Sequence, residues 1–414
     1  MRILVITPYY LPDGGPSAPM VAMLAEHLVS LGHKVTVLAA VPHFPSGQVA
    51  REYRQRLWTW KNHNGVRVGR VWVPSGSRAN LAHRLLTFSV YQTLATLVGL
   101  WLKYDVAFIS NPAIETGLPF ALLGWMRRKP VIFGVWDVYP EIGIRMGLFR
   151  SRAVINLVGL LEDSCMKRAN RIQVLGNGFV ADLAHHRISP DQIVVIPPWV
   201  DTKLVFPLPR HNSFSHELNL DDYFIVLYAG NLGLSQGLET VLEAAQKLTD
   251  RSEILFLFVG EGSGKSKLVS QAAKLSNVRF LPFQPRERLP EILATADISL
   301  VVLKHMIGSS SLPSKTFSIL ASGRPVIASV DEGSDAWNLV QLSQSGLCVL
   351  PEDPAALVKA ILLLKDDLAQ CELMGRNGRI WVEKYHSSET AATLFGILFQ
   401  KVLDETKSRV KGDS

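Results

Sequence analysis

One lysine stands in a polar loop directly before an apolar segment, within SSLPSKTFSILASGRPVIA at residues 310–328. Pro313 stiffens this loop and Ser314 can cap a helix that starts there, so we expect Lys315 in the first helical turn. A cation is unfavourable there because the helix N-terminus is itself partly positive. A bound diphosphate would reverse this, since the helix amides and the ammonium would contact the same oxygens. The pattern predicts Lys315 as a phosphate ligand, with a solvent-exposed lysine as the alternative.

Two glycine-rich segments of the second half have the pattern of loops that lie beneath a nucleotide. AGNLGLSQGLETVLEAA, residues 229–245, follows an apolar run and opens an amphipathic helix, with Asn231 and Gln236 where a phosphate would lie. A glycine turn without a ligand is the alternative. VGEGSGKSKL, residues 259–268, resembles a P-loop, but the first glycine of that motif would fall on Val259, which excludes an ATPase. We expect a strand and a turn, with Gly262 in contact with the donor nucleotide.

Two further segments could carry chemistry in the first half. TPYYLPDGGPSAPMVAMLAEHL, residues 7–28, places Gly14 and Gly15 between a strand and a helix. Close backbone approach there predicts contact with a phosphate or a sugar, and an ordinary tight turn is the alternative. In FGVWDVYPEIG, residues 133–143, Asp137 ends a strand and Glu141 follows a proline. Carboxylates at the carboxyl end of a parallel strand suit acid–base work, although Asp137 could instead cap the next turn.

Other catalytic patterns are missing from the sequence. There is no G-x-S-x-G, and no close cluster of His, Asp and Glu suggests a metal. We expect His185 and His186 to be solvated on a polar helix face. A dehydrogenase is disfavoured because no G-x-G-x-x-G follows the first strand.

The elements that must position these loops alternate along the whole chain. Thirteen short runs rich in Val, Ile and Leu, from RILVIT to GLCVLP, are separated by helical patterns. Such runs are typical of parallel strands covered on both faces. A Pro-rich polar stretch at 197–222 divides them, so we expect two doubly wound α/β domains facing across a cleft. The predicted domains are 1–200, with a C-terminal helix at about 386–410 crossing back, and 201–385.

Composition supports two buried cores and an asymmetric charge. The chain has 414 residues, of which 48% are hydrophobic and 19% charged. Residues 1–200 carry 21 Lys and Arg against 11 Asp and Glu, whereas residues 201–414 carry 22 against 25. A basic first half suits phospholipid head groups or a phosphorylated substrate, and no nucleic-acid-binding motif accompanies it. Three cysteines without a CxxC pair indicate neither a disulfide scaffold nor a zinc site and fit a reducing compartment.

One apolar segment bears on whether the protein contacts a membrane. Residues 85–102, LLTFSVYQTLATLVGLWL, contain no charge over 18 residues, near the lower limit for a membrane span. The polar residues within it favour a helix packed in or beside the core. A true membrane span is the alternative. Arg78, His83, Arg84 and Trp101 flank the segment, so a packed helix with one edge against lipid is also compatible with the sequence. The opening MRILVITPYY is too short in its apolar core for a signal peptide. The expected location is cytoplasmic, peripheral on the inner face of the plasma membrane.

Taken together, these segments resemble glycosyltransferase family 4, which has the GT-B fold. The resemblance rests on GGPSAPMVAMLAEHLVSLGHKVTVLA, GNLGLSQGLETVLEAA, FVGEGSGKSKL, ADISLVVL and LPSKTFSILASGRPVIAS, and covers nearly the whole chain. It is strongest to the WbuB-like branch and to colanic-acid transferases, which serve O-antigen and capsule assembly. The resemblance implies transfer of a sugar from a nucleotide-diphosphate donor with retention of configuration and without a metal or other cofactor. It also implies a donor-binding second domain, an acceptor-binding first domain and a final helix, TAATLFGILFQKVLDE, that returns to the first.

The sequence departs from the family pattern at several ligand positions. An arginine and a lysine of most members are replaced by Asn231 and Gln236, as in the WbuB-like branch. The two family glutamates fall on Ser310 and Ser318, which leaves the ribose and sugar contacts open. A family histidine is replaced near Trp136, leaving Asp137. Lys315 is the expected substitute for the lost cations, and Arg324 is a second candidate.

These observations define one expected mechanism and two alternatives. Lys315, Gln236 and Asn231 would bind the donor diphosphate, with Gly15, Gly262, Ser310, Ser314 and Ser318 as further donor contacts. Asp137 would orient or deprotonate the acceptor hydroxyl, with Gly14 and Glu141 as acceptor contacts. The resemblance favours a UDP-linked amino or deoxy sugar as the donor, and the expected acceptor is a lipid-linked glycan. The alternatives are a UDP-sugar 2-epimerase-like enzyme on the same fold and a non-catalytic nucleotide-binding member of an assembly complex. The oligomeric state is left open.

Overall fold

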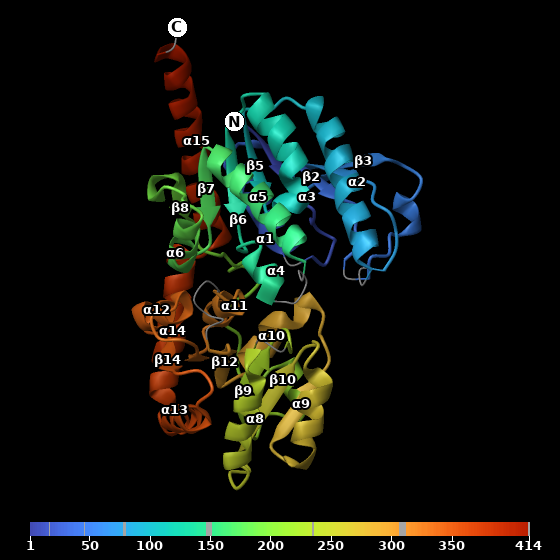
Figure 1. Ribbon diagram of the computed structural model, residues 1–414. Coiled ribbons are helices and arrows are strands. Elements are labelled where there is room, and N and C mark those ends of the chain that lie inside the picture. Colours follow the sequence, from blue (N-terminus) through green and yellow to red (C-terminus); the bar gives the residue numbers. More distant parts are fainter. Residues whose placement is uncertain are drawn as a thin grey trace. The chain divides into compact units, whose positions relative to one another are not determined.

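The computed structural model describes residues 1–15, 17–44, 46–77, 80–145, 151–233, 236–305 and 312–412. The chain divides into two units, Met1–Pro197 with Ser388–Ser414 as unit 1 and Pro198–Ser387 as unit 2. Each unit contains one sheet flanked by helices (Figure 1). The predicted class, two doubly wound α/β domains, is confirmed.

The sheet of unit 1 has eight strands in the order β3-β4-β2-β1-β5-β6-β7-β8. The bounds are β1 Arg2–Ile6, β2 Lys34–Ala40, β3 Trp58–His63, β4 Val66–Val71, β5 Val106–Ser110, β6 Val131–Val135, β7 Arg171–Val174 and β8 Ile193–Val195. All pairings are parallel except β3 with β4, which is an antiparallel edge hairpin. The seven predicted strands form the parallel part of this sheet, and β3 was not among the predicted strands. The segment WTWKNH has no continuous apolar run, because an edge strand needs none.

Both faces of this sheet are covered, as continuous apolar strands require. In β5, Ala107 and Ile109 belong to one core cluster together with Tyr91 from helix α2 (Leu81–Leu100). The residue between them, Phe108, points the other way and meets Phe395 of helix α15 (Ser388–Gly412) with ring centroids 5.3 Å apart. Alternate residues of a strand point to opposite faces, so β5 is apolar throughout.

The helices of unit 1 include its last element, although unit 2 intervenes in the sequence. The α-helices are α1 Ala18–Ser30, α2 Leu81–Leu100, α3 Ala113–Pro119, α4 Glu141–Arg145, α5 Arg152–Arg168, α6 Asn177–His185 and α15 Ser388–Gly412. Helix α15 packs on α1, and Glu405 near its end forms an ion pair with Arg171 at 2.6 Å. The chain therefore returns to unit 1.

Unit 2 has a six-stranded parallel sheet in the order β11-β10-β9-β12-β13-β14. The strands are β9 Phe224–Ala229, β10 Ile254–Val259, β11 Val278–Leu281, β12 Ile298–Val302, β13 Val326–Ser329 and β14 Gly346–Val349. The helices are α7 Ser213–Glu217, α8 Leu238–Lys247, α9 Lys265–Gln271, α10 Leu289–Thr295, α11 Lys315–Ala321, α12 Asp335–Ser343, α13 Pro354–Asp366 and α14 Leu368–Tyr385. The loops after β9, β10 and β12 all leave from the carboxyl edge of the sheet, which brings the predicted ligand residues together.

The apolar segment at 85–102 lies almost entirely within α2. The Asn80 side chain accepts hydrogen bonds from the Ala82 and His83 amides, which sets the start of this helix. Tyr91 and Ala95 face the core, while Leu97 stays about half exposed. Among the described residues, no helix combines the length and apolarity needed to cross a bilayer.

Candidate functional site

The ammonium of Lys315 lies at the carboxyl edge of the unit 2 sheet, on the first residue of α11. Its Nζ donates to Tyr228 Oη at 2.6 Å and to Gln236 Oε1 at 2.9 Å. The same atom lies 3.9 Å from the centroid of the Tyr228 ring. A Cβ added to Gly230 would lie 3.6 Å from the Lys315 Nζ, so the glycine loop after β9 runs directly beside the ammonium. The structure thus brings together Lys315 and Gln236, as predicted.

Among the described residues, Lys315 has no carboxylate as a counter-charge. Burial lowers its pKa to about 7, and no acidic group contributes to the shift. Within the described part of the chain, no carboxylate forms an ion pair with it. Only neutral groups hold the ammonium, so an anion that entered this position would stabilise its charged form.

Tyr228 is the member of this group that sequence reasoning missed. It is fully buried in β9, and its hydroxyl contacts the Asn231 carbonyl at 2.8 Å and Gln236 Oε1 at 2.9 Å. Burial raises the pKa of this phenol, so it stays neutral. Asn231 therefore joins the cluster through its backbone. The available signal was a tyrosine in the strand FIVLYA, two residues before the glycine that follows the strand.

The start of α11 differs from the prediction in one respect. Ser314 does not cap the helix, because its backbone is already helical and its side chain accepts no amide. Instead, the Thr316 amide donates to the Pro313 carbonyl at 3.0 Å and the Phe317 amide donates to the Ser314 carbonyl at 3.2 Å. These tight-turn bonds occupy amides that we expected to be free for a ligand. The contribution to anion binding therefore rests more on the ammonium than on the helix end.

Three other residues near Lys315 in the sequence were candidates for donor binding: Ser310, Ser318 and Arg324. Ser318 is half-buried one turn further along α11, and Ser310 lies outside the described residues. Arg324 follows the opposite end of α11 and donates to the Leu208 carbonyl at 3.0 Å. Arg324 is thus not brought together with Lys315, and its role as a second phosphate ligand is not supported.

The glycine loops after β9 and β10 pack on one another. The Leu232 amide donates to the Glu261 carbonyl at 2.9 Å, and the Gly230 amide donates to the Val259 carbonyl at 2.9 Å. A Cβ on Gly262 would lie 2.4 Å from the Leu232 carbonyl carbon and 2.6 Å from Asn231 Oδ1. Gly262 is therefore required for loop packing, and its contact with a donor stays a prediction.

Lys265, the lysine of the P-loop-like segment, is already neutralised. Its Nζ lies 2.6 Å from Glu261 Oε1 and 3.2 Å from the Gly260 carbonyl oxygen. The segment forms a strand, a glycine turn and the start of α9, as expected. Lys265 and Lys315 thus form a natural pair for comparison, since within the described ranges the first has a carboxylate partner and the second has none.

In unit 1, the Gly14-Gly15 loop is organised by a buried aspartate. Asp13 accepts hydrogen bonds from the Gly15 amide at 3.0 Å and the His43 amide at 2.9 Å. A Cβ on Gly15 would lie 2.4 Å from the Tyr9 ring, whereas one on Gly14 would meet nothing closer than 3.6 Å. Packing therefore explains Gly15, while Gly14 is exposed and sterically free. Their predicted sugar or phosphate contacts stay predictions.

Asp137 lies at the carboxyl end of β6 with its side chain exposed. Among the described residues, its carboxylate has no hydrogen bond or ion pair, so it does not cap the following turn. Loss of water to nearby protein atoms raises its pKa to about 6, and the remaining solvent contact limits the energy of this shift. Asn111 fixes the segment, since its Nδ2 donates to the Asp137 carbonyl at 2.5 Å and its Oδ1 accepts from the Trp136 amide at 3.1 Å. Sequence reasoning missed Asn111.

Glu141 and His186 meet in unit 1, which corrects the expectation for the histidine. His186 is only 13% exposed in its side chain, with Nδ1 2.7 Å from Asp163 Oδ1 and Nε2 3.7 Å from Glu141 Oε1. The polar face that we expected to be solvated is covered because α6 lies beside these two acids, whereas His185 is exposed.

A further buried carboxyl group supports the loop that carries Asn111. Glu162 is 1% exposed, and burial raises its pKa to about 8. Its Oε1 accepts the Ala113 amide at 2.6 Å, which favours the charged form but does not offset the burial. Glu162 therefore holds the turn that follows Asn111.

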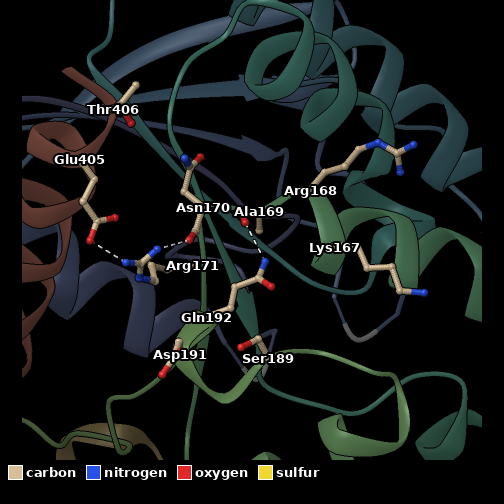
Figure 2. A pocket seen from close by; sticks show the side chains of 10 residues that line it. All are labelled: Lys167, Arg168, Ala169, Asn170, Arg171, Ser189, Asp191, Gln192, Glu405 and Thr406. Atoms are coloured by element: carbon tan, nitrogen blue, oxygen red, sulfur yellow. Dashed lines mark hydrogen bonds and ion pairs between the residues drawn. The ribbon is translucent and has the colours of Figure 1, made fainter. Parts of the chain in front are cut away.

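A basic pocket of about 490 Å³ lies elsewhere in unit 1, where β7 begins (Figure 2). Its Arg171 donates to Glu405 at 2.6 Å and to the Asn170 carbonyl at 2.7 Å, as the dashed lines show (Figure 2). β7 runs parallel to β6, so this amino end lies at the sheet edge opposite Asp137. Because its central cation is already paired, we do not place the chemistry here.

Two family models match the sequence, one in each half. "Glycosyl transferase 4-like domain" matches residues 15–199, and "Glycosyl transferases group 1" matches residues 210–381. The chain is a glycosyltransferase of family 4. A relative from Escherichia coli K12, "Putative colanic acid biosynthesis glycosyl transferase WcaI", is 27% identical over 378 residues, or 87% of this chain and 91% of WcaI. The predicted family and enzyme class are confirmed.

Solved structures support the GT-B fold of this family 4 glycosyltransferase. Sucrose-phosphate synthase from Thermosynechococcus elongatus aligns with a TM-score of 0.73 and 19% identity over 98% of this chain and 99% of that one. HepE from Anabaena, solved with UDP-glucose, aligns with a TM-score of 0.69 and 15% identity over 99% and 100%. At these identities the likeness concerns the fold.

Proposed function

We propose that this family 4 enzyme transfers a sugar from a nucleotide-diphosphate sugar to a glycan acceptor in polysaccharide synthesis. The observation that carries the proposal is the Lys315 ammonium at the carboxyl edge of the unit 2 sheet, where the described residues that hold it are all neutral. A diphosphate is the anion that a nucleotide sugar would bring there. The HepE structure, solved with UDP-glucose, supports this donor class, and the name of WcaI supports polysaccharide synthesis.

Lys315 would act mainly on the leaving group. As the bond between the anomeric carbon and the diphosphate oxygen breaks, negative charge grows on that oxygen, and the nearby ammonium stabilises it. Preorganised charges of this kind are each worth about 3–4 kcal/mol of barrier. Tyr228 and Gln236 hold the ammonium in place, so little reorganisation is needed when charge develops.

Retention follows if the acceptor oxygen bonds to the anomeric carbon on the face that the diphosphate leaves. The acceptor proton then passes to the departing phosphate oxygen, so no metal and no protein nucleophile is required. In this route Asp137 would orient the acceptor hydroxyl. In the alternative route its carboxylate would accept the proton in place of the phosphate oxygen, and among the described residues no partner occupies that carboxylate. Its raised pKa brings it closer to that of a general base working near neutral pH.

The acceptor would be a lipid-linked glycan, and the protein would associate peripherally with the cytoplasmic face of the membrane. The basic first half and the exposed leucines of α2 support this location. Flotation with anionic liposomes at low and high salt tests it. Binding at low salt is expected, and failure to float there would contradict the proposal.

The transfer proposal is tested with purified protein, a panel of nucleotide sugars and lipid-linked acceptors. Lys315→Ala and Asp137→Asn should each lower turnover, whereas Lys265→Ala should not, because that lysine is paired with Glu261. Unchanged turnover in both site variants would remove this mechanism. Products formed with the donor alone separate the alternatives, since an epimerised sugar indicates an epimerase and the absence of any transfer or hydrolysis indicates a binding protein.

A further inference from the structure

Unit 1 contains a second cavity that the proposed transfer reaction does not use. A groove of about 720 Å³ lies between the β3–β4 hairpin and the end of α2. Its walls include Trp58 and Trp60 from β3, Arg67 from β4, Leu97 and Trp101 at the end of α2, and Lys103 beyond it. The volume falls within the range of small-molecule sites.

The register of the hairpin builds one wall of this groove. Trp60 pairs with Gly69, and Asn62 pairs with Arg67, so these side chains share one face of the hairpin. A Cβ on Gly69 would lie 2.7 Å from the Trp60 ring, so its absence lets the indole approach the backbone of β4 closely. Arg67 then stacks on this indole, with its guanidinium carbon 4.2 Å from the ring centroid. The guanidinium is thereby held in a fixed position at the groove.

The opposite wall exposes an unusual amount of indole. Trp101 is 90% exposed, and Trp58 across the groove is 50% exposed. Leu97, one turn before Trp101 on α2, is 53% exposed. Keeping this much apolar surface in water is costly unless something covers it.

The charges of the groove identify what kind of molecule fits. None of the lining residues is acidic, and within the described chain neither Arg67 nor Lys103 forms an ion pair. A neutral sugar fits poorly, because its hydroxyl groups need acceptors and Thr36 carries the only side-chain acceptor among the lining residues. A phosphate group beside two cations, joined to hydrocarbon against indole and leucine, satisfies both kinds of surface.

We propose that this groove binds one molecule of an anionic phospholipid. The phosphate lies against Arg67 and Lys103, and the acyl chains lie against Trp58, Trp101 and Leu97. The site extends the membrane association proposed above by giving it a defined lipid contact, and it does not depend on sugar transfer. Helix α2 is roughly 30 Å long, so this contact lies about that distance from the Asn80 end of the helix.

The test uses lipids that dissolve as single molecules, so that adsorption to a bilayer does not contribute. Dihexanoyl phosphatidylglycerol, below its micelle concentration, is titrated into the full chain by calorimetry without any nucleotide sugar. We expect saturable binding with one molecule per chain. Dihexanoyl phosphatidylcholine and glycerol phosphate should each bind at least about tenfold more weakly, since one lacks net charge and the other lacks hydrocarbon.

Matched variants on the same hairpin make the result specific. Arg67→Gln should weaken phosphatidylglycerol binding at least about tenfold, while Lys61→Gln should not change it, because Lys61 is exposed on the other face of β3. Trp58→Ala should also weaken binding without a change of charge. The proposal is overturned if no saturable binding occurs, if Arg67→Gln binds as wild type, or if the two lipids bind equally. Because no donor is present, none of these outcomes depends on transferase activity.

Discussion

Donor affinity should weaken about tenfold between pH 6 and pH 8, because Lys315 must be charged to hold the diphosphate. With a pKa of about 7 in the free protein, its ammonium is roughly 90% protonated at pH 6 and roughly 10% at pH 8. A bound diphosphate keeps the lysine charged, so binding at pH 8 must take up close to one proton. The corresponding loss of binding free energy is about 1.4 kcal/mol.

The assay is calorimetric titration with UDP-glucose in two buffers that differ in ionisation enthalpy. UDP-glucose suits this purpose because its diphosphate has no group that titrates between these pH values. Lys315→Arg should bind without this pH dependence, since a guanidinium stays protonated. Lys265→Met is the matched control and should retain the pH dependence, because Lys265 already has Glu261 as its partner.

Lys315 should also lower the stability of the free protein. Its folded pKa of about 7 lies below the usual 10.5, so the unfolded chain binds more protons between these values and stability rises with pH across that window. Lys315→Met should therefore raise the melting temperature at pH 7 while abolishing donor binding. Wild-type affinity that is constant from pH 6 to pH 8, with no proton uptake, would refute Lys315 as the counter-charge of the donor.

Three further variants test the supporting contacts. The wild type should lose stability as pH rises from 4.5 to 8, because the folded protein resists ionisation of Glu162, whose pKa is raised to about 8. Glu162→Gln should remove this loss. At pH 8 the variant should be more stable than the wild type by at least about 1.4 kcal/mol in urea unfolding. Asn111→Ala should lower kcat about tenfold with little change in donor KM, since it releases the Asp137 segment; an equal rise in KM would contradict a positioning role. Gly262→Ala should cost about 1–3 kcal/mol by forcing a methyl group against Leu232, and unchanged unfolding would show that the two glycine loops separate easily.

Most of the strands could be predicted because burial on both faces leaves a continuous apolar run in the sequence. All thirteen predicted strands are present in the described structure, whereas β3 was missed because its edge position relaxes the apolar pattern. Lys315 and Gln236 could be paired in advance because both follow strands of one parallel sheet. Tyr228 and Asn111 could not, because their roles depend on hydrogen bonds across distant loops. His186 was misjudged because its carboxylate partner Asp163 comes from another helix.

The return of α15 to unit 1 has a consequence for synthesis on the ribosome. Phe395, which meets Phe108 in the core of unit 1, is translated only after all of unit 2. At 5–20 residues per second, the first unit must wait roughly 10 to 40 s for its last helix. During that interval the apolar surface that α15 covers, Phe108 included, stays exposed, and transiently exposed apolar surface of this kind promotes aggregation.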